Sequence, residues 1–430
     1  MPNFNLSDDV FQKAAERYPT PFHLYDEKGI RENCRGLKHA FAGMEGYKEY
    51  FAVKALPNPA ILRILKQEGI GLDCSSMTEL MLAEAVGVTG ENIMFSANNM
   101  PPEEFQRARA MGAYINLDDL THTQMLKDNG GIPDCVCLRY NPGGDFVIGT
   151  HVMGSPGEAK YGMTRGQLTE ALTRLKAWGA RSFGLHAFLS SNTQDPGYYP
   201  VLAKLLFETA LELSDQTGVP IAFINLSGGI GIPYRPEEQP VDIIQVGEAI
   251  RCIYADTFGR ASVKGVRLFT ELGRFLTAPH GFLLTRAIHE KNIHKRYIGV
   301  DASACHLMRP AMYGAYHHIH VCGKRDQRAD TLYDVAGALC ENNDKFAVNR
   351  LLPPVEPGDL LIIHDTGAHG AAMGYNYNGR LRCAEVLHKE DGSFEMIRRA
   401  ETPADYFATL DGDASYARLL SDAETGVYSV

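Results

Sequence analysis

The sequence predicts an α/β protein: a (β/α)8 TIM barrel plus a C-terminal, mostly-β barrel-like domain. Before residue 275, eight short β-rich runs are bounded by turn residues, and each is separated from the next by room for a helix. The intervening segments place apolar residues three and four apart and often finish at glycine, as amphipathic helices do. After about residue 280 the pattern changes to strands alternating with turns. A doubly wound open sheet stays open as an alternative, because counting strands does not show closure.

The eight predicted barrel strands are 50–54, 70–74, 92–96, 113–117, 134–141, 182–189, 221–228 and 266–273. The clearest helical segments between them are PAILRILKQEG, SMTELMLAEAVG, PEEFQRARAMG, RGQLTEALTRLKAWG and YYPVLAKLLFETALELSDQTG. In the second domain the predicted strands are FLLTRAI, KRYIGVDA, AYHHIHV, TLYDVAG, DLLIIHD and AEVLHKE. Because the strand-like FHLY precedes the barrel, we expect a barrel over 30–278 and a β domain formed by 1–29 and 279–430.

Composition favours work on a small molecule. The 42 Lys and Arg residues against 52 Asp and Glu give a formal charge of −10, so no positive field attracts nucleic acid or anionic lipid. No apolar run of about 18 residues is present, and the start MPNFNLSDDV lacks the regions of a signal peptide. Nine cysteines, an odd number without a CxxC pair, predict reduced thiols and no structural metal. We therefore expect a cytoplasmic protein that binds neither membrane nor nucleic acid.

Polar side chains follow the predicted barrel strands where each strand ends. In a barrel of this class the functional residues sit at the C-terminal strand ends, so we expect a site there. The candidates are Lys54, Asp73, Ser75, Arg139, His186, Ser227, Gly228, Gly229, Glu271, Gly273 and Arg274.

Three of these features suit one kind of cofactor, although each has an ordinary structural reading. The amine of Lys54 after FAVK suits Schiff-base formation with a carbonyl group, and a solvated lysine is the alternative. The LSGGIG turn presents backbone N–H groups that suit a phosphate, but glycine also simply serves turns. The carboxylate of Glu271 suits a pyridinium N–H, and the guanidinium of Arg274 suits an anion. The alternative is that the two side chains form a surface ion pair with each other.

The remaining candidates stay open from the residues alone. His186 by itself is typical of a core histidine, and Asp73 of a helix cap. The cluster His317, His318 and His320 resembles a metal site, but solvated or edge histidines are the favoured interpretation. Cys340 in CENND is either a buried small hydrophobe or a proton donor whose pKa the acidic neighbours raise.

Taken together, the motifs resemble the fold-type III pyridoxal-phosphate (PLP) decarboxylases, and most closely the diaminopimelate decarboxylases. FAVKALPNP, RYNPGG, KYGM, SGGIG, ELGR, HLMRPAMYGAYHHI, CENND and NYN follow one another in that family's order. The resemblance covers most of residues 20–390, and the pair RPAMYGAYH and CENND is far more specific than any single motif. It implies a PLP-dependent amino-acid carboxy-lyase.

The resemblance also implies roles for residues around the cofactor. Lys54 would carry PLP as a Schiff base, His186 would stack on the ring, and Glu271 would pair with the pyridinium nitrogen. Backbone amides of Ser227, Gly228, Gly229 and Gly273 would hold the phosphate, with Arg274 near both phosphate and substrate. Further cofactor contacts are expected from Asp73, Ser190 and Tyr375.

On the substrate side, the resemblance implies that Arg309 and Tyr313 bind a distal carboxylate. Cys340 and Glu341 would come from the other subunit of a head-to-tail homodimer, where Cys340 protonates the carbanion and Glu341 recognises the distal ammonium group. Arg274, His369 and Tyr375 complete the expected substrate contacts. The implied reaction converts meso-2,6-diaminopimelate to L-lysine and CO2 in lysine biosynthesis.

Four departures from the family pattern concern the substrate more than the cofactor. This chain has HAFLSSN where the family has HIGSQ, so that Ser190, Ser191 or Asn192 takes the place of the family's phosphate-contacting serine. It also has ELGR where the family has EPGR. His369 replaces a tyrosine, for which Tyr375 or Tyr377 could substitute, and His306 replaces an acidic residue. Two alternatives follow. One is a decarboxylase of ornithine, lysine, arginine, carboxynorspermidine or a siderophore precursor, and the other is a non-catalytic regulator on the same fold.

Overall fold

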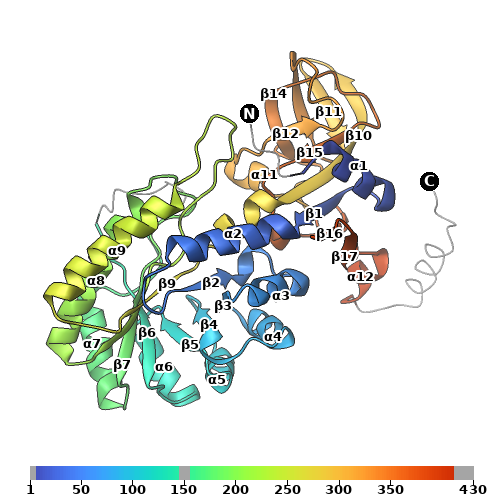
Figure 1. Ribbon diagram of the computed structural model, residues 1–430. Coiled ribbons are helices and arrows are strands. Elements are labelled where there is room, and N and C mark those ends of the chain that lie inside the picture. The colour runs from blue at the N-terminus through green and yellow to red at the C-terminus, as the bar shows by residue number, and fades with distance from the viewer. Residues whose placement is uncertain (1–5, 145–154, 411–430) are drawn as a thin grey trace. The chain divides into compact units, whose positions relative to one another are not determined.

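The computed structural model describes residues 6–144 and 155–410. The chain divides into two compact units (Figure 1). Residues 30–233 and 237–278 form the first, and residues 1–29, 234–236 and 279–430 form the second. We refer to them as the barrel unit and the β unit. Among the described residues, no helix is long and apolar enough to cross a membrane.

Eight parallel strands of the barrel unit close into a ring. Each pairs with the next in sequence, and the first, β2, also pairs with the last, β9. The prediction of a barrel is therefore confirmed, and the open-sheet alternative is excluded. The strands are β2 (Lys48–Ala52), β3 (Gly71–Cys74), β4 (Ile93–Ser96), β5 (Tyr114–Leu117), β6 (Cys135–Arg139), β7 (Ser182–His186), β8 (Ile221–Asn225) and β9 (Arg267–Thr270).

Helices lie outside this ring (Figure 1), and several begin with side chains that cap their first amides. Asn58 accepts a hydrogen bond from Ala60 N ahead of Pro59, and Thr164 forms a capping box with Gln167. The helices are α2 (Glu27–Ala40), α3 (Pro59–Gln67), α4 (Met77–Ala85), α5 (Pro102–Ala110), α6 (Thr121–Asn129), α7 (Arg165–Ala177), α8 (Tyr198–Thr217), α9 (Ile243–Arg260) and the short α10 (Gly273–Thr277).

Large side chains fill part of the barrel interior. One cluster of buried residues consists of Tyr50, Met94, Tyr114, Cys137, Phe223 and Phe269. The rings of Phe223 and Phe269 stack with centroids 4.4 Å apart. A Cβ atom on Gly184 would overlap the Phe223 ring, so glycine makes room for the phenyl group.

In the described part of the chain, the β unit is built on a nine-stranded sheet that includes the N-terminal strand. Strand β1 (Phe22–Asp26) pairs antiparallel with β10 (Gly281–Asn292) and parallel with β16 (Ala384–His388). The other strands are β11 (Arg296–Val300), β12 (Ile319–Val321), β13 (Thr331–Ala336), β14 (Lys345–Leu352), β15 (Leu360–Ile363) and β17 (Phe394–Arg398). The helices are α1 (Asp8–Arg17), α11 (Arg309–Tyr313) and α12 (Pro403–Phe407).

Two local expectations are corrected by the structure. The first barrel strand ends at Ala52, and Lys54 lies in the following 3-10 turn Val53–Ala55, because the Leu56 N–H bonds back to the Val53 carbonyl. His317 and His320 are buried, so the interpretation as solvated residues was wrong for both, whereas His320 does lie on a strand, β12, that pairs with one neighbour among the described strands. His317 binds the His364 carbonyl oxygen and His320 binds the Asp8 carboxylate, which satisfies their ring nitrogens inside the unit.

Gly184→Ala tests the packing of the barrel interior. The added methyl group must displace the Phe223 ring, and we expect a loss of about 1–3 kcal/mol in unfolding free energy. Urea unfolding followed by circular dichroism measures it. Gly36→Ala is the matched control. Gly36 lies inside α2 with open space around the new Cβ, so this change should raise the free energy of unfolding by about 0.5–1 kcal/mol. Equal stability of the two variants would contradict the packing described.

Candidate active site

The C-terminal strand ends of the barrel unit bring most of the predicted cofactor residues together. His186 is the last residue of β7, Asp73 lies in β3, and Lys54 follows β2. Glu271 follows β9 directly. The order of parallel strands around the closed ring thus gathers residues that are more than 200 positions apart in the sequence.

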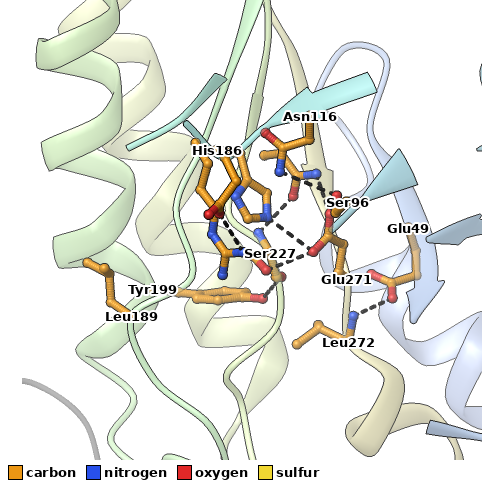
Figure 2. Close-up of polar contacts among 12 residues, drawn as sticks. Glu49, Ser96, Asn116, His186, Leu189, Tyr199, Ser227, Glu271 and Leu272 are labelled. Atoms are coloured by element: carbon orange, nitrogen blue, oxygen red, sulfur yellow. Dashed lines mark hydrogen bonds and ion pairs between the residues drawn. The ribbon is translucent and has the colours of Figure 1, made fainter. Parts of the chain in front are cut away.

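Glu271 is the centre of a buried hydrogen-bond network (Figure 2). Its Oε1 accepts from Asn225 Nδ2 at 2.7 Å, and its Oε2 accepts from Ser227 Oγ at 2.7 Å. His186 Nε2 lies 3.2 Å from Oε2. A carboxylate offers about four lone-pair sites, and the three neighbours use three of them. One more donor can therefore be accepted at Oε1.

This network keeps Glu271 ionised. Burial by itself would raise the pKa, but the neighbouring His186 and the donors from Ser227 and Asn225 lower the pKa of Glu271 to about 2. Burial also lowers the pKa of His186 below its usual value, so the imidazole is neutral at pH 7. The site thus holds a fixed negative charge beside a neutral ring.

Four buried polar atoms of the barrel strands have no hydrogen-bond partner among the described residues. They are Asp73 Oδ1, Asn116 Oδ1, Arg139 Nε and His186 Nδ1. Burial, followed by the proximity of Glu271, raises the pKa of Asp73 well above its usual value. Such unsatisfied groups in the core are costly unless a ligand serves them.

The LSGGIG turn forms a close-packed surface that only small residues permit. Ser227 has φ +56° and Gly229 has φ +126°. A Cβ on Gly228 would lie 2.7 Å from the Glu271 carbonyl oxygen, and one on Gly229 would lie 2.6 Å from the Tyr198 ring. The Ser227 N–H is already used, because it donates to Asn225 Oδ1, and the Gly273 N–H donates to the Glu271 carbonyl. Of the predicted phosphate amides, Gly228 and Gly229 therefore fit best.

The segment HAFLSSN runs beside that turn. Thr193 and Ile230 form a parallel bridge, and the Asn192 side chain accepts from the Ile232 N–H at 3.2 Å. Asn192 thus holds the two loops together. Of the three candidates for the family's serine, Ser190 is buried and Ser191 is half-buried.

Sequence reasoning missed several residues that fix this geometry. Asn225 bridges Glu271 and Ser227, and the Tyr199 hydroxyl donates to the Ser227 carbonyl oxygen. Asp118, also missed, forms a buried ion pair at 3.2 Å with Arg139, which the sequence did indicate. A usable signal was present for Asn225, a polar residue at the end of the apolar run IAFIN.

In the β unit, the predicted carboxylate ligand Arg309 is buried and held on two sides. Its Nη1 donates to His317 Nε2 at 2.8 Å, and the Tyr234 ring lies 4.6 Å from its guanidinium carbon. His317 Nδ1 in turn donates to the His364 carbonyl oxygen at 2.8 Å, which fixes the tautomer that can accept from Arg309. Tyr313, four residues further along α11, is exposed instead.

Cys340 and Glu341 lie in an exposed turn that a second segment supports. The Cys340 N–H donates to Asn378 Oδ1, and the Tyr377 hydroxyl donates to Glu341 Oε1, both at 2.8 Å. Buried Asp344 shapes the turn by accepting from the Ala304 and Leu339 amides. Cys340 is exposed, so its interpretation as a buried hydrophobe was wrong.

Three further predicted or altered positions lie in the β unit. His369 is half-buried and has φ +55°, and Tyr375 is half-buried beside the exposed Tyr377. His306, which replaces an acidic residue of the family, is buried, and its ring nitrogens bind the Ser303 N–H and the Leu381 carbonyl oxygen. The ring of His306 therefore links two backbone segments inside the β unit.

A family model described as the pyridoxal-binding domain of pyridoxal-dependent decarboxylases matches residues 27–278. The chain belongs to this family. The predictions of PLP as cofactor and of an amino-acid decarboxylase are thereby confirmed. The match supports an enzyme rather than a non-catalytic regulator.

Curated relatives of this decarboxylase cover nearly the whole chain. Protein TabA of Pseudomonas amygdali pv. tabaci is 43% identical over 92% of each chain. Diaminopimelate decarboxylase of Methanothermobacter thermautotrophicus is 35% identical over 95% of each, and that of Pseudomonas fluorescens is 34% identical over 92% of this chain and 93% of its own.

A solved diaminopimelate decarboxylase from M. jannaschii superposes on this decarboxylase with a TM-score of 0.87. It has 29% identity and covers 93% of this chain and 94% of its own. A second structure of that enzyme, in co-complex with L-lysine, has a TM-score of 0.85 at 30% identity and covers 94% of both chains.

The barrel residues fit PLP. Glu271 has a lone pair for a pyridinium N–H, and Asp73 and His186 bring unsatisfied buried atoms. Gly228 and Gly229 leave a surface that a Cβ would fill. An anion, a ring and an amine-reactive aldehyde would each find a suitable partner here.

The buried Glu49 predicts a pH-dependent stability of this decarboxylase. It accepts from the Leu272 N–H beside Glu271 (Figure 2), and burial raises its pKa to about 8. A raised folded-state pKa favours folding below the unfolded value of about 4.5, and this contribution is lost as pH rises towards 8. The free energy of unfolding of Glu49→Gln minus that of wild type should therefore be about 1–3 kcal/mol larger at pH 8 than at pH 5.

Urea unfolding at the two pH values measures this gain. Glu45→Gln, an exposed change four residues earlier, is the matched control and should show no such gain. Parallel pH profiles of wild type and Glu49→Gln would contradict the assignment of a protonated Glu49.

Proposed function

We propose that this decarboxylase converts meso-2,6-diaminopimelate to L-lysine and CO2. The observation that carries the substrate is the buried Arg309, whose planar guanidinium suits a distal carboxylate. Glu341, an acidic side chain oriented by Tyr377, suits the ammonium group on the same carbon. Ornithine and arginine lack that pair of charges. Relatives named diaminopimelate decarboxylase, at 30–35% identity, support the proposal.

We assign the barrel residues as follows. Lys54 carries the cofactor, the ionised Glu271 holds its ring nitrogen as pyridinium, and Gly228 and Gly229 donate to its phosphate, with Arg274 adjacent. When bound, PLP supplies the electron sink that stabilises the carbanion left by CO2. Because Glu271 stays ionised over the physiological range, its carboxylate would accept the N–H of a pyridinium ring throughout that range.

The β unit supplies the substrate contacts and the proton. Arg309 holds the distal carboxylate, with Tyr313, His369 and Tyr375 as further contacts. Cys340 donates the proton to the carbon from which CO2 leaves. Since Cys340 and Glu341 are exposed on their own chain, we assign them to the site of the other subunit in a head-to-tail homodimer. The cytoplasmic location stays a prediction.

A second candidate is the same reaction on another carboxylated or basic amino acid. Protein TabA, which is 43% identical to this chain, has a name that states no reaction, so this relative does not favour diaminopimelate over another substrate. The HAFLSSN segment and His369, which depart from the family pattern, also support the second candidate. This candidate changes the substrate and leaves the cofactor chemistry in place.

A substrate panel tests the proposal. Purified protein with PLP is incubated separately with meso-diaminopimelate, L-lysine, D-lysine, ornithine and arginine, and CO2 and amine product are quantified. We expect lysine from meso-diaminopimelate alone and no product with Lys54→Ala. Turnover of another amino acid in preference would transfer the assignment to the second candidate.

Subunit complementation tests the shared site. Lys54→Ala and Cys340→Ala each damage a different half of one site, so in a mixed dimer one of the two sites is intact. Co-refolded equal amounts should recover roughly a quarter of wild-type activity, well above either variant alone. Activity that equals the mean of the two separate variants would show that each chain builds its own site.

A further inference from the structure

The segment that departs most from the family pattern places an aromatic ring beside the cofactor lysine. Phe188 of HAFLSSN has its ring centroid 5.7 Å from Lys54 Nζ and 5.8 Å from the guanidinium carbon of Arg139. Its edge is also close to the phosphate turn, because a Cβ on Gly228 would lie 3.8 Å from Phe188 Cε2. One ring therefore lies next to the cofactor amine, the phosphate turn and a buried cation.

His186, by contrast, lacks the surface that stacking needs. A side chain that packs against a flat cofactor must present one open face before the cofactor binds. His186 is only 1% exposed, and its Nε2 is bound to Glu271. Phe188 is half-buried and so keeps part of its ring accessible.

We propose that Phe188, and not His186, packs its ring against the pyridine ring of bound PLP. Lys54 carries the cofactor within reach of the Phe188 ring, and the Gly228 turn sets its other end. His186 acts as a positioning residue that orients Glu271. The proposal rests on the PLP dependence of the family and is independent of which amino acid is decarboxylated.

The substitution of a phenyl ring has a chemical consequence. Phenylalanine offers dispersion and quadrupole contacts but no proton or hydrogen bond. The stacked face would therefore carry no titrating group. In the absence of PLP, the same ring faces the Lys54 ammonium group as a cation–π partner.

Cofactor binding by the apo-protein, without turnover, tests the proposal. Phe188→Leu keeps the apolar bulk and removes the aromatic face, whereas Phe188→Tyr keeps the face. Apo-protein of each variant and of His186→Gln is titrated with PLP by equilibrium dialysis, and the visible circular dichroism of the bound cofactor is recorded. Urea midpoints of the apo-proteins check that each variant is folded.

We expect Phe188→Leu to raise the dissociation constant of PLP roughly three- to tenfold and to weaken the visible dichroism. Phe188→Tyr should stay within about twofold of wild type, and His186→Gln should keep the dichroic band. The proposal is wrong if Phe188→Leu binds PLP like wild type while His186→Gln loses the band. It is equally wrong if the leucine and tyrosine variants lose affinity to the same extent. Because no substrate is present, failure of the diaminopimelate assignment leaves these readouts unchanged.

Discussion

The buried carboxylate of Glu271 is the interaction around which the strand ends of the barrel are arranged. A buried charge is tolerated only when donors surround it, and Asn225, Ser227 and His186 provide them. These donors come from β7, from β8 and from the turn that follows β8. Satisfying one charge therefore fixes the register of neighbouring strand ends, and it leaves one lone pair of the carboxylate for a further donor.

The loops above this network are fitted to each other rather than to the strands alone. The turn at Gly228 and Gly229 packs against the Tyr198 ring and the Glu271 backbone, while Asn192 secures the 186–193 segment to the same turn. Within HAFLSSN, His186 contacts Glu271, whereas Asn192 contacts the turn. Changes in the later part of the segment can therefore alter the loop while the contact between His186 and Glu271 is kept.

The β unit uses histidines in a different way from a metal site. His317 fixes the orientation of Arg309, and His320 contacts both His364 and Asp8. Burial lowers the pKa of His318 and of His320 to about 4, so these rings act as neutral hydrogen-bonding groups at pH 7. The neutral imidazole of His317 therefore orients the buried guanidinium of Arg309 without adding a second positive charge beside it.

The sequence by itself determined the fold class, the eight barrel strands and the β unit, because periodicity, turn residues and ordered motifs are local signals. The same kind of signal led to the prediction of Lys54, Glu271 and Arg309 as site residues. Only the tertiary structure decided which of these side chains meet. Closure of the barrel joins Asn225 to Glu271, burial turns the histidines 317 and 320 into core residues, and the packing of one loop leaves Phe188 half-buried while covering His186. Contacts between distant segments and the burial of each side chain depend on how strands pair around the ring, which no short stretch of sequence records.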